Sequence, residues 1–308
     1  MNRRKFIKKS AEYTAYAVFG VILPGVFKGT AKADRLPDIV VASGAPGAST
    51  RAAVTALGGM SRFVKQGARV VIKPNMSFPN PPDWATTTHP DVVRELASMC
   101  LQAGASAVVV LDNPLRNTEL CLERSGIRRA LESLPGSRTE GIESERFFKE
   151  VRVPEGIDLT STMIMKQVLE ADVLIAAPVA KSHSATGLSL SLKGMMGLIY
   201  NRSDLHLNMD LNTAVVDLCT VLKPQLTVID VSRLLTSGGP GGPGKIITMN
   251  KIIASIDMVA ADAATVQLGT WYGRKFQARQ VRHIRMAHER GLGNMNIDRQ
   301  LVKEIDAS

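Results

Sequence analysis

The chain of 308 residues is 45% hydrophobic and 21% charged, and it contains three cysteines. This composition excludes disordered, collagen-like and low-complexity chains, and three cysteines exclude a scaffold built on disulfides. The formal net charge is +10, but residues 1–33 hold seven basic residues and one acidic residue, so the other 275 residues carry only +4. Such a balance does not indicate a nucleic-acid partner.

The first 33 residues have the pattern of an export signal. A basic start containing Arg3 and Arg4 is followed by a weakly apolar run and by the small-x-small cleavage site Ala31-Lys32-Ala33. The arginine pair resembles a twin-arginine (Tat) signal, which delivers folded proteins to the Tat translocase before a signal peptidase removes it. We therefore predict a Tat-type signal peptide at residues 1–33 and a periplasmic mature protein. An uncleaved N-terminal membrane anchor is the alternative.

Apolar runs alternate with helical patterns along the mature chain. The runs predict strands at 38–43, 69–73, 107–111, 148–153, 172–178, 226–230 and 246–255. The helical patterns lie at 49–64, 90–102, 118–134, 161–170, 188–199, 211–222 and 258–272. Most strand runs are continuously apolar, which is typical of strands covered on both faces. We therefore predict an α/β fold, with a mostly parallel sheet covered by helices on both faces.

We expect a single α/β domain over residues 34–308, with its core at about 38–270. The polar segment 135–156 predicts an irregular insertion, and 277–308 predicts a helical, basic tail. In this tail, His283 and His288 are interpreted as part of a solvated face.

The three cysteines, Cys100, Cys121 and Cys219, form no C-x-x-C spacing. We expect them to be isolated and mostly buried, and we expect no iron–sulfur cluster ligated by this chain's cysteines.

Polar residues follow several of the predicted strands. In open α/β sheets, ligands bind beyond the carboxyl ends of the strands, so these residues predict one shared cleft. The candidate ligand-binding residues are Lys73, Asn75, Asp112 and Ser182. In the Gly/Pro loop 238–244, the backbone N–H groups of Gly239 and Gly241 are candidate hydrogen-bond donors to an anion. A flexible lid or a simple turn is the alternative for this loop.

Two lysines and a histidine stand out in the segment 177–197. Lys181, His183 and Lys193 lie among small and hydroxyl-bearing residues in an otherwise apolar neighbourhood. A poorly hydrated lysine can bind a carboxylate or phosphate, or lose its proton and act as a base. These three residues are the candidate catalytic residues. The alternatives are a solvated loop for 181–183 and a lysine stem lying along an apolar helix for Lys193.

Three histidines, His89, His183 and His206, fall in the candidate loops and suggest a metal site. No local spacing such as H-E-x-x-H supports this hypothesis. Further along the chain, Asp257 is interpreted as a helix cap, whereas the role of Asp262 is left open.

An ordered set of motifs resembles the bacterial and archaeal family called domain of unknown function 362. The motifs are Ile72-Lys73-Pro74-Asn75, Thr87-Thr88-His89-Pro90, Asp112, Pro178-Val179-Ala180-Lys181-Ser182-His183, Lys193-Gly194-Met195-Met196-Gly197 and the segment 254–262. Family members typically have threonine and asparagine where this chain has Ser182 and Gly194. Many carry a ferredoxin-like cysteine cassette, which implies redox work, and this sequence lacks the cassette. A distant similarity to nickel-pincer lactate racemases would single out Lys181 and His183.

Two functions remain open at this point. In the first, an exported member of this family binds a small anionic ligand, or a metal or cofactor, in a Lys/His-lined cleft and acts as a redox-associated enzyme. Lys73, Lys181 and Lys193 would supply positive charge, and His183 would act as general base or metal ligand. In the second, the protein is a non-catalytic accessory or maturation partner of an exported redox enzyme. The sequence identifies neither a substrate nor a cofactor.

Overall fold

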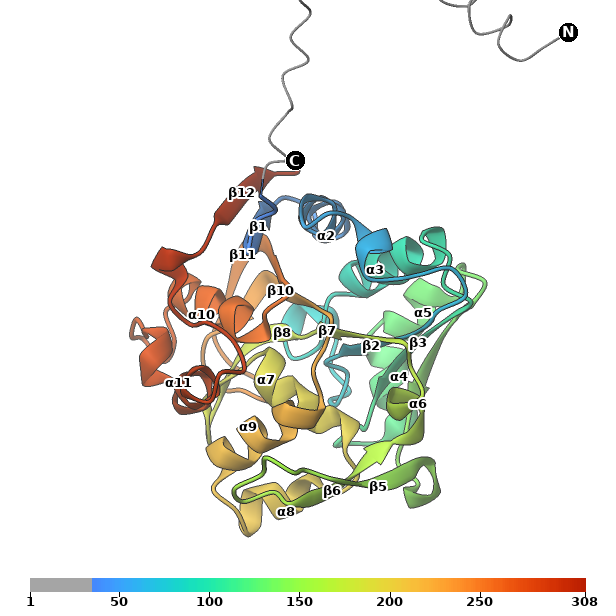
Figure 1. The fold of residues 1–308 in the computed structure, drawn as a ribbon. Coiled ribbons are helices and arrows are strands. Elements are labelled where there is room, and N and C mark those ends of the chain that lie inside the picture. Colours follow the sequence, from blue (N-terminus) through green and yellow to red (C-terminus); the bar gives the residue numbers. More distant parts are fainter. Residues whose placement is uncertain (1–34) are drawn as a thin grey trace, which may run out of the picture. The chain divides into compact units, whose positions relative to one another are not determined.

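The structure is a computed structural model and describes residues 35–308. A ten-stranded sheet lies at the centre of this part of the chain (Figure 1). The strand order is β12-β1-β11-β10-β7-β2-β3-β4, and β8 pairs with β10 and β9. These strands are β1 Ile39–Ser43, β2 Arg69–Pro74, β3 Ala107–Asp112, β4 Ser137–Gly141, β7 Val173–Ala177, β8 Val179–His183, β9 Gly187–Ser189, β10 Leu226–Leu235, β11 Ile246–Ser255 and β12 Val302–Asp306. Most pairings are parallel, and β1–β11, β10–β11 and β8–β9 are antiparallel. The predicted signal peptide lies outside the described residues.

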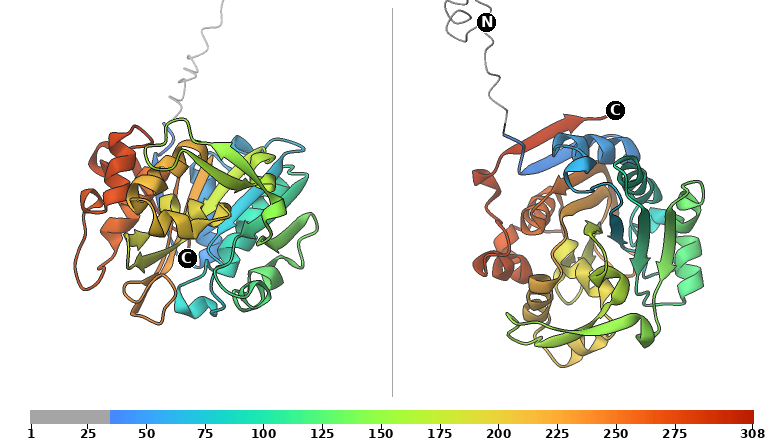
Figure 2. Two further views of the ribbon diagram at one scale, coloured as in Figure 1. Left: turned by 90° about the horizontal axis from the view of Figure 1, so that it is seen from below. Right: turned by 45° about the vertical axis from the view of Figure 1, so that its right-hand side comes forward.

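Helices cover both faces of the sheet, as the sequence predicts (Figures 1 and 2). One face is covered by α2 Pro46–Ala56, α3 Pro90–Gln102, α4 Thr118–Arg124 and α5 Ile127–Leu131. The other is covered by α7 Ser191–Gly194, α9 Leu211–Val221, α10 Met258–Leu268 and α11 Arg282–Glu289. The short helices α6 Lys166–Leu169 and α8 Arg202–Leu207 complete the set, and no helix among the described residues has the length and apolarity needed to cross a membrane.

The central strands contribute side chains to two separate cores. In β2, Val71 packs into one core, whereas Val70 and Ile72 pack into the other. Successive side chains of a strand point to opposite faces, so a strand buried on both sides is apolar at every position. This geometry explains the continuous apolar runs.

Several predicted helices differ from the structure. The helix predicted over 188–199 begins in β9 and continues as the short α7 and a 3₁₀ turn, and the one predicted over 118–134 is divided into α4 and α5. The helix predicted from Ser49 begins at Pro46, because proline is favoured in the first turn and fixes the backbone angle there. The helix predicted over 161–170 is mostly the strand β6 Ser161–Met165, which pairs with β5 Phe148–Arg152 in a separate two-stranded sheet.

The predicted insertion and tail are also more regular than expected. Residues 135–156 contain β4, which extends the main sheet by pairing with β3, as well as β5. The tail is helical only in part, because its end forms β12 and pairs in parallel with β1. The solvated-face interpretation is wrong for His283, whose side chain is fully buried. Cys100, Cys121 and Cys219 are free and buried, which confirms their predicted burial.

Candidate functional site

A cavity of about 280 Å³ lies at the carboxyl ends of β2, β3 and β8. It collects the predicted residues Lys73, Asn75, Asp112, Lys181, His183, Lys193 and His206. Arg202, which the sequence analysis did not single out, joins them from α8. Arg202 and His206 are four residues apart on one helix, a spacing that places both side chains on the same face. This spacing was the signal that could have identified the arginine.

The deepest ion pair of the cavity joins Lys73 to Asp112. Lys73 is the penultimate residue of β2 and Asp112 is the last residue of the neighbouring β3, and their side chains approach to 3.2 Å between Nζ and Oδ1. The other Asp112 oxygen accepts hydrogen bonds from Met76 N at 3.1 Å and Ser77 Oγ at 2.8 Å. Burial lowers the pKa of Lys73, and the Asp112 charge opposes that shift. Asp112 therefore anchors both the lysine and the loop that follows β2.

Gly197 makes room for this pair. It lies in the 3₁₀ turn Met195–Leu198, directly beside the two side chains. A Cβ atom built on Gly197 would lie 2.2 Å from both Asp112 Oδ1 and Lys73 Cε, well inside contact distance. Only glycine fits at this position without displacing the buried pair.

Lys181 and His183 lie in a strand, so the alternative of a solvated loop is wrong. The strand β8 hydrogen-bonds to β10 on one side and to β9 on the other. Residues two apart on a strand point to the same face, so both side chains enter the cavity. Ser182 points the other way, and its Oγ accepts a hydrogen bond from Gly239 N at 3.0 Å.

The Lys181 ammonium is held by few polar groups. It donates to the carbonyl oxygen of Thr86 at 2.7 Å and lies 5.2 Å from the centre of the Phe78 ring. Burial lowers the pKa of Lys181 to about 7, with Asp112 acting against the shift and Lys73 adding to it.

Lys193 has a similar environment at the start of α7. Its Nζ lies 2.9 Å from Met196 Sδ and 3.5 Å from His206 Nε2. Burial, helped by the Arg202 charge, lowers the pKa of Lys193 to about 7. Both lysines thus change charge close to neutral pH.

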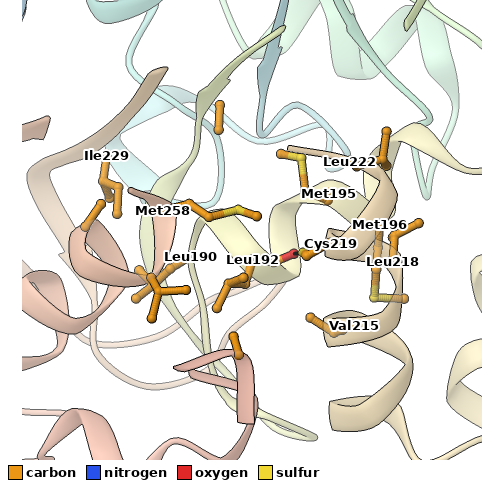
Figure 3. Close-up of a cluster of buried hydrophobic side chains, with 14 of the residues drawn as sticks. Leu190, Leu192, Met195, Met196, Val215, Leu218, Cys219, Leu222, Ile229 and Met258 are labelled. Atoms are coloured by element: carbon orange, nitrogen blue, oxygen red, sulfur yellow. Dashed lines mark hydrogen bonds between the residues drawn. The ribbon is translucent and has the colours of Figure 1, made fainter. Parts of the chain in front are cut away.

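A buried carboxylate on α10 positions α7. Asp262 accepts hydrogen bonds from the backbone N–H groups of Ser191, at 2.8 Å, and Leu192, at 3.1 Å, and from the Ser191 hydroxyl. Burial raises the pKa of Asp262 to about 7, against the effect of these hydrogen bonds. On the other side of α7, the Cys219 thiol of α9 contacts the Leu192 carbonyl at 3.5 Å within an apolar cluster (Figure 3). Asp262 therefore fixes the turn that carries Lys193. By contrast, Asp257 caps α10 as interpreted from the sequence.

The hydrogen bonding of His183 defines its protonation. Its Nδ1 accepts a hydrogen bond from Ala185 N at 3.1 Å, so the neutral ring carries its proton on Nε2. Burial and the nearby Lys193 lower the pKa of His183 to about 3. Its ring stacks on that of His206, with 5.9 Å between the ring centres. At neutral pH, His183 is therefore a hydrogen-bond donor through Nε2. A metal bound at Nε2 would require the ring proton to move to Nδ1, and Nδ1 could then no longer accept the hydrogen bond from Ala185.

His89 has a different role from the one predicted. It caps α3, where its Nδ1 accepts a hydrogen bond from Asp91 N at 3.1 Å, and it does not line the cavity. The structure therefore brings together His183 and His206 without His89. Within residues 35–308, no group of three or more His, Cys, Asp or Glu side chains is placed to hold a metal ion.

The Gly/Pro loop packs against the site, and one of its two predicted donor amides, that of Gly239, is already occupied. Gly239 N already donates to Ser182, and the Gly241 carbonyl accepts a hydrogen bond from Asn80 at 2.9 Å. A Cβ at Gly239 would lie 1.9 Å from the Ser182 carbonyl oxygen, so the loop needs glycine for close approach to β8. Pro240 is the residue of this loop that lines the cavity within the described chain.

Comparison with known proteins gives the family. Residues 70–267 match the family model described as domain of unknown function (DUF362). The chain belongs to the DUF362 family. A thylakoid-associated protein from Synechocystis sp. is 26% identical over 225 residues, which cover 70% of this chain and 67% of that protein.

Two solved structures also resemble this DUF362 protein, and the chain spans about half the length of each. One is the lactate racemase apoprotein from Thermoanaerobacterium thermosaccharolyticum, with 14% identity, a TM-score of 0.43, and coverage of 71% of this chain and 54% of that one. The other is a structural-genomics protein from Thermotoga maritima, with 15% identity, a TM-score of 0.36, and coverage of 61% and 51%.

The fit around Gly197 gives a first prediction. We expect Gly197→Ala to lower the free energy of unfolding by about 1–3 kcal/mol, because the added methyl group must displace the Lys73–Asp112 pair. Urea unfolding measures the change. The matched control is Gly194→Ala in α7, where the new Cβ would meet Pro178 at an ordinary 3.8 Å. Alanine is the better helix former, so this control should be neutral or stabilising. Equal stability of the two variants would contradict the argument.

The burial of Lys193 gives a second prediction. The folded protein releases the Lys193 proton near pH 7, whereas the unfolded chain keeps it until about pH 10.4. Between these two pH values the unfolded state binds more protons than the folded state. The free energy of unfolding therefore rises with pH, and the destabilisation caused by the buried Lys193 becomes smaller. We expect Lys193→Met to raise the free energy of unfolding by about 1–4 kcal/mol at pH 7.

The gain from Lys193→Met should shrink between pH 7 and pH 10, as measured by urea unfolding at each pH. Lys223→Met, at an exposed position, is the control and should change stability by less than about 0.5 kcal/mol. A loss of stability in Lys193→Met, or a gain that is independent of pH, would show that Lys193 is not a strained cation.

Proposed function

We propose that this protein binds a small anionic ligand in the Lys/His-lined cavity. The observation that carries the proposal is an excess of positive charge, with three buried lysines and a half-buried arginine. Lys73, Lys181, Lys193 and Arg202 line one cavity, and within the described chain Asp112 is the acidic residue that lines it with them. Asp112 is already paired with Lys73.

The other three cations lack a carboxylate partner of their own. Among residues 35–308, no carboxylate oxygen lies within 4.0 Å of the side-chain nitrogens of Lys181, Lys193 or Arg202. Burying a cation without a counter-charge is costly, and such strain is concentrated at functional sites. A bound anion would supply the missing charge and raise the pKa values of both lysines. The Nε2–H of His183 adds a donor that carries no charge.

Within this proposal, acid–base chemistry belongs to the lysines. A group whose pKa lies near the working pH is best suited to accept and return a proton. Lys181 and Lys193, each with a pKa of about 7, meet this condition, whereas the pKa of about 3 for His183 does not. The candidate general base therefore moves from His183 to a lysine, and His183 orients the ligand.

Binding of sulfate and acetate tests the anion site. Both ions keep a constant charge between pH 6 and pH 8.5, so a change in affinity reports the protein. We expect the affinity to rise as the pH falls through 7, because Lys181 and Lys193 gain protons there. Isothermal titration calorimetry at three pH values measures this trend.

Variants separate the site from general electrostatic attraction. Lys181→Ala and Lys193→Ala should each weaken binding about tenfold or more, which corresponds to ~1.4 kcal/mol. The exposed control Lys223→Ala should bind as the unaltered protein does. If neither ion binds, or if all three variants bind equally, the cavity is not an anion site. The role of accessory or maturation partner of an exported redox enzyme would then be the better hypothesis.

We further propose that the protein works in the periplasm after export through the Tat translocase. This proposal is supported by the sequence of residues 1–33 alone. Replacing both Arg3 and Arg4 by lysine keeps the charge but removes the twin-arginine motif. We expect the double variant to remain in the cytoplasm, as measured by cell fractionation. Periplasmic delivery of this variant would contradict the Tat route, and retention of the unaltered protein in the membrane fraction would favour the uncleaved anchor.

A further inference from the structure

The cavity has a charged interior and two exposed leucines on its rim. The side chains of Lys73, Lys181, Lys193 and His183 are between 2% and 7% exposed. Two leucines that line the same cavity are far more open, with Leu115 48% exposed and Leu207 79% exposed. The lining therefore has a buried cationic interior and a solvent-exposed edge that carries these two leucines together with Ser203 and His206.

The two rim leucines come from separate elements. Leu115 lies in the loop after β3, where its backbone N–H donates to the Ser77 carbonyl at 3.1 Å. Leu207 is the last residue of α8, the helix that also carries Arg202. Single exposed leucines are ordinary on a protein surface and need no explanation. Here, however, two of them line one cationic cavity, and they come from elements far apart in sequence.

Phe78 connects this rim with the cationic interior. Its half-buried ring lines the cavity, with its centre 5.2 Å from the Lys181 ammonium. The ring is backed by the Gly/Pro loop, since a Cβ at Gly241 would lie 2.9 Å from it. A ring in this position can contact both the anionic head of a ligand and the first carbons attached to it.

The volume also exceeds what a small anion fills. One water molecule takes up about 30 Å³ of liquid, so about 280 Å³ holds an anionic head together with several further heavy atoms. A ligand made only of polar groups would leave the two rim leucines exposed to water. An apolar portion would cover them and gain the free energy of burying that surface.

We propose that the ligand is an amphiphilic anion, whose anionic head binds among Lys181, Lys193 and His183 and whose apolar portion packs against Phe78, Leu115 and Leu207. This inference rests on the proposed anion site and specifies its ligand class. The head sets the requirement for charge, and the rim sets a preference for carbon chains over polar substituents.

A series of linear carboxylates tests the proposal. Acetate, butanoate and hexanoate share one head and differ only in chain length. Each buried methylene contributes about 0.8 kcal/mol, or up to about fourfold in affinity. We expect the affinity measured by isothermal titration calorimetry to rise from acetate to hexanoate. Neutral hexan-1-ol should not bind detectably, because it lacks the anionic head.

Variants of the rim provide the matched comparison. Leu115→Gln combined with Leu207→Gln keeps the side-chain size and should lower the affinity for hexanoate much more than the affinity for acetate, so that hexanoate loses most of its advantage. Leu207→Gln alone is the milder variant, and thermal melting checks that each protein is folded. The control is Leu169→Gln, because Leu169 is 42% exposed on α6 and does not line the cavity.

The outcomes distinguish this inference from the proposed function. If acetate binding depends on Lys181 and Lys193 but hexanoate binds no more tightly, the anion site stands and the amphiphilic ligand is wrong. The same holds if hexanoate keeps its advantage in the rim variants. If hexan-1-ol binds as well as hexanoate, the rim is an apolar site without a charged head. If no carboxylate and no sulfate binds, the proposed function itself fails.

Discussion

The structure depends on the burial of several ammonium groups with too few negative charges. Asp112 compensates Lys73, and it is one hydrogen-bonded carboxylate facing a cavity that also contains Lys181 and Lys193. Desolvation penalises the charged form of each lysine, so their pKa values fall. Such an arrangement lowers the stability of the folded protein and is therefore the kind of strain that a functional site retains.

The surrounding fold keeps these charges in place with short backbone contacts. Asp262 holds the first turn of α7 through the N–H groups of Ser191 and Leu192, and the apolar cluster behind α7 prevents it from shifting. Gly197 lets the following turn approach Asp112 and Lys73 more closely than a side chain would allow. Packing and backbone hydrogen bonds around the cavity thus determine where each lysine points.

The sequence predicts the layers of the fold and part of the site for clear physical reasons. Strands buried on both faces are apolar throughout, so their positions can be recognised in the sequence. Parallel strands end at one edge of the sheet, so the sequence also predicts that Lys73 and Asp112 lie close together. The orientation of Ser182 could not be predicted, because it depends on β8 being a strand. Neighbouring side chains of a strand point to opposite faces, so Ser182 points away from the cavity that Lys181 enters. His89 was misleading for a related reason: a histidine at the start of a helix can cap it, and the sequence does not show which role prevails. The tail strand β12 depends on a partner far away in sequence, β1, which local patterns cannot reveal.

The short helix α8 carries both polar and apolar side chains of the cavity lining. It contributes the Arg202 cation and the His206 ring to the polar side of the cavity and Leu207 to the rim. Its N-terminal end is tied to the sheet, because the Arg202 guanidinium donates to the Asn113 carbonyl directly after β3. A change in the six residues of α8 would therefore alter both the charge and the apolar contact offered to a ligand, while the Lys73–Asp112 pair stays with the strands. The sheet thus holds Lys73, Asp112 and Lys181, whereas α8 contributes a charged and an apolar side chain to the same cavity.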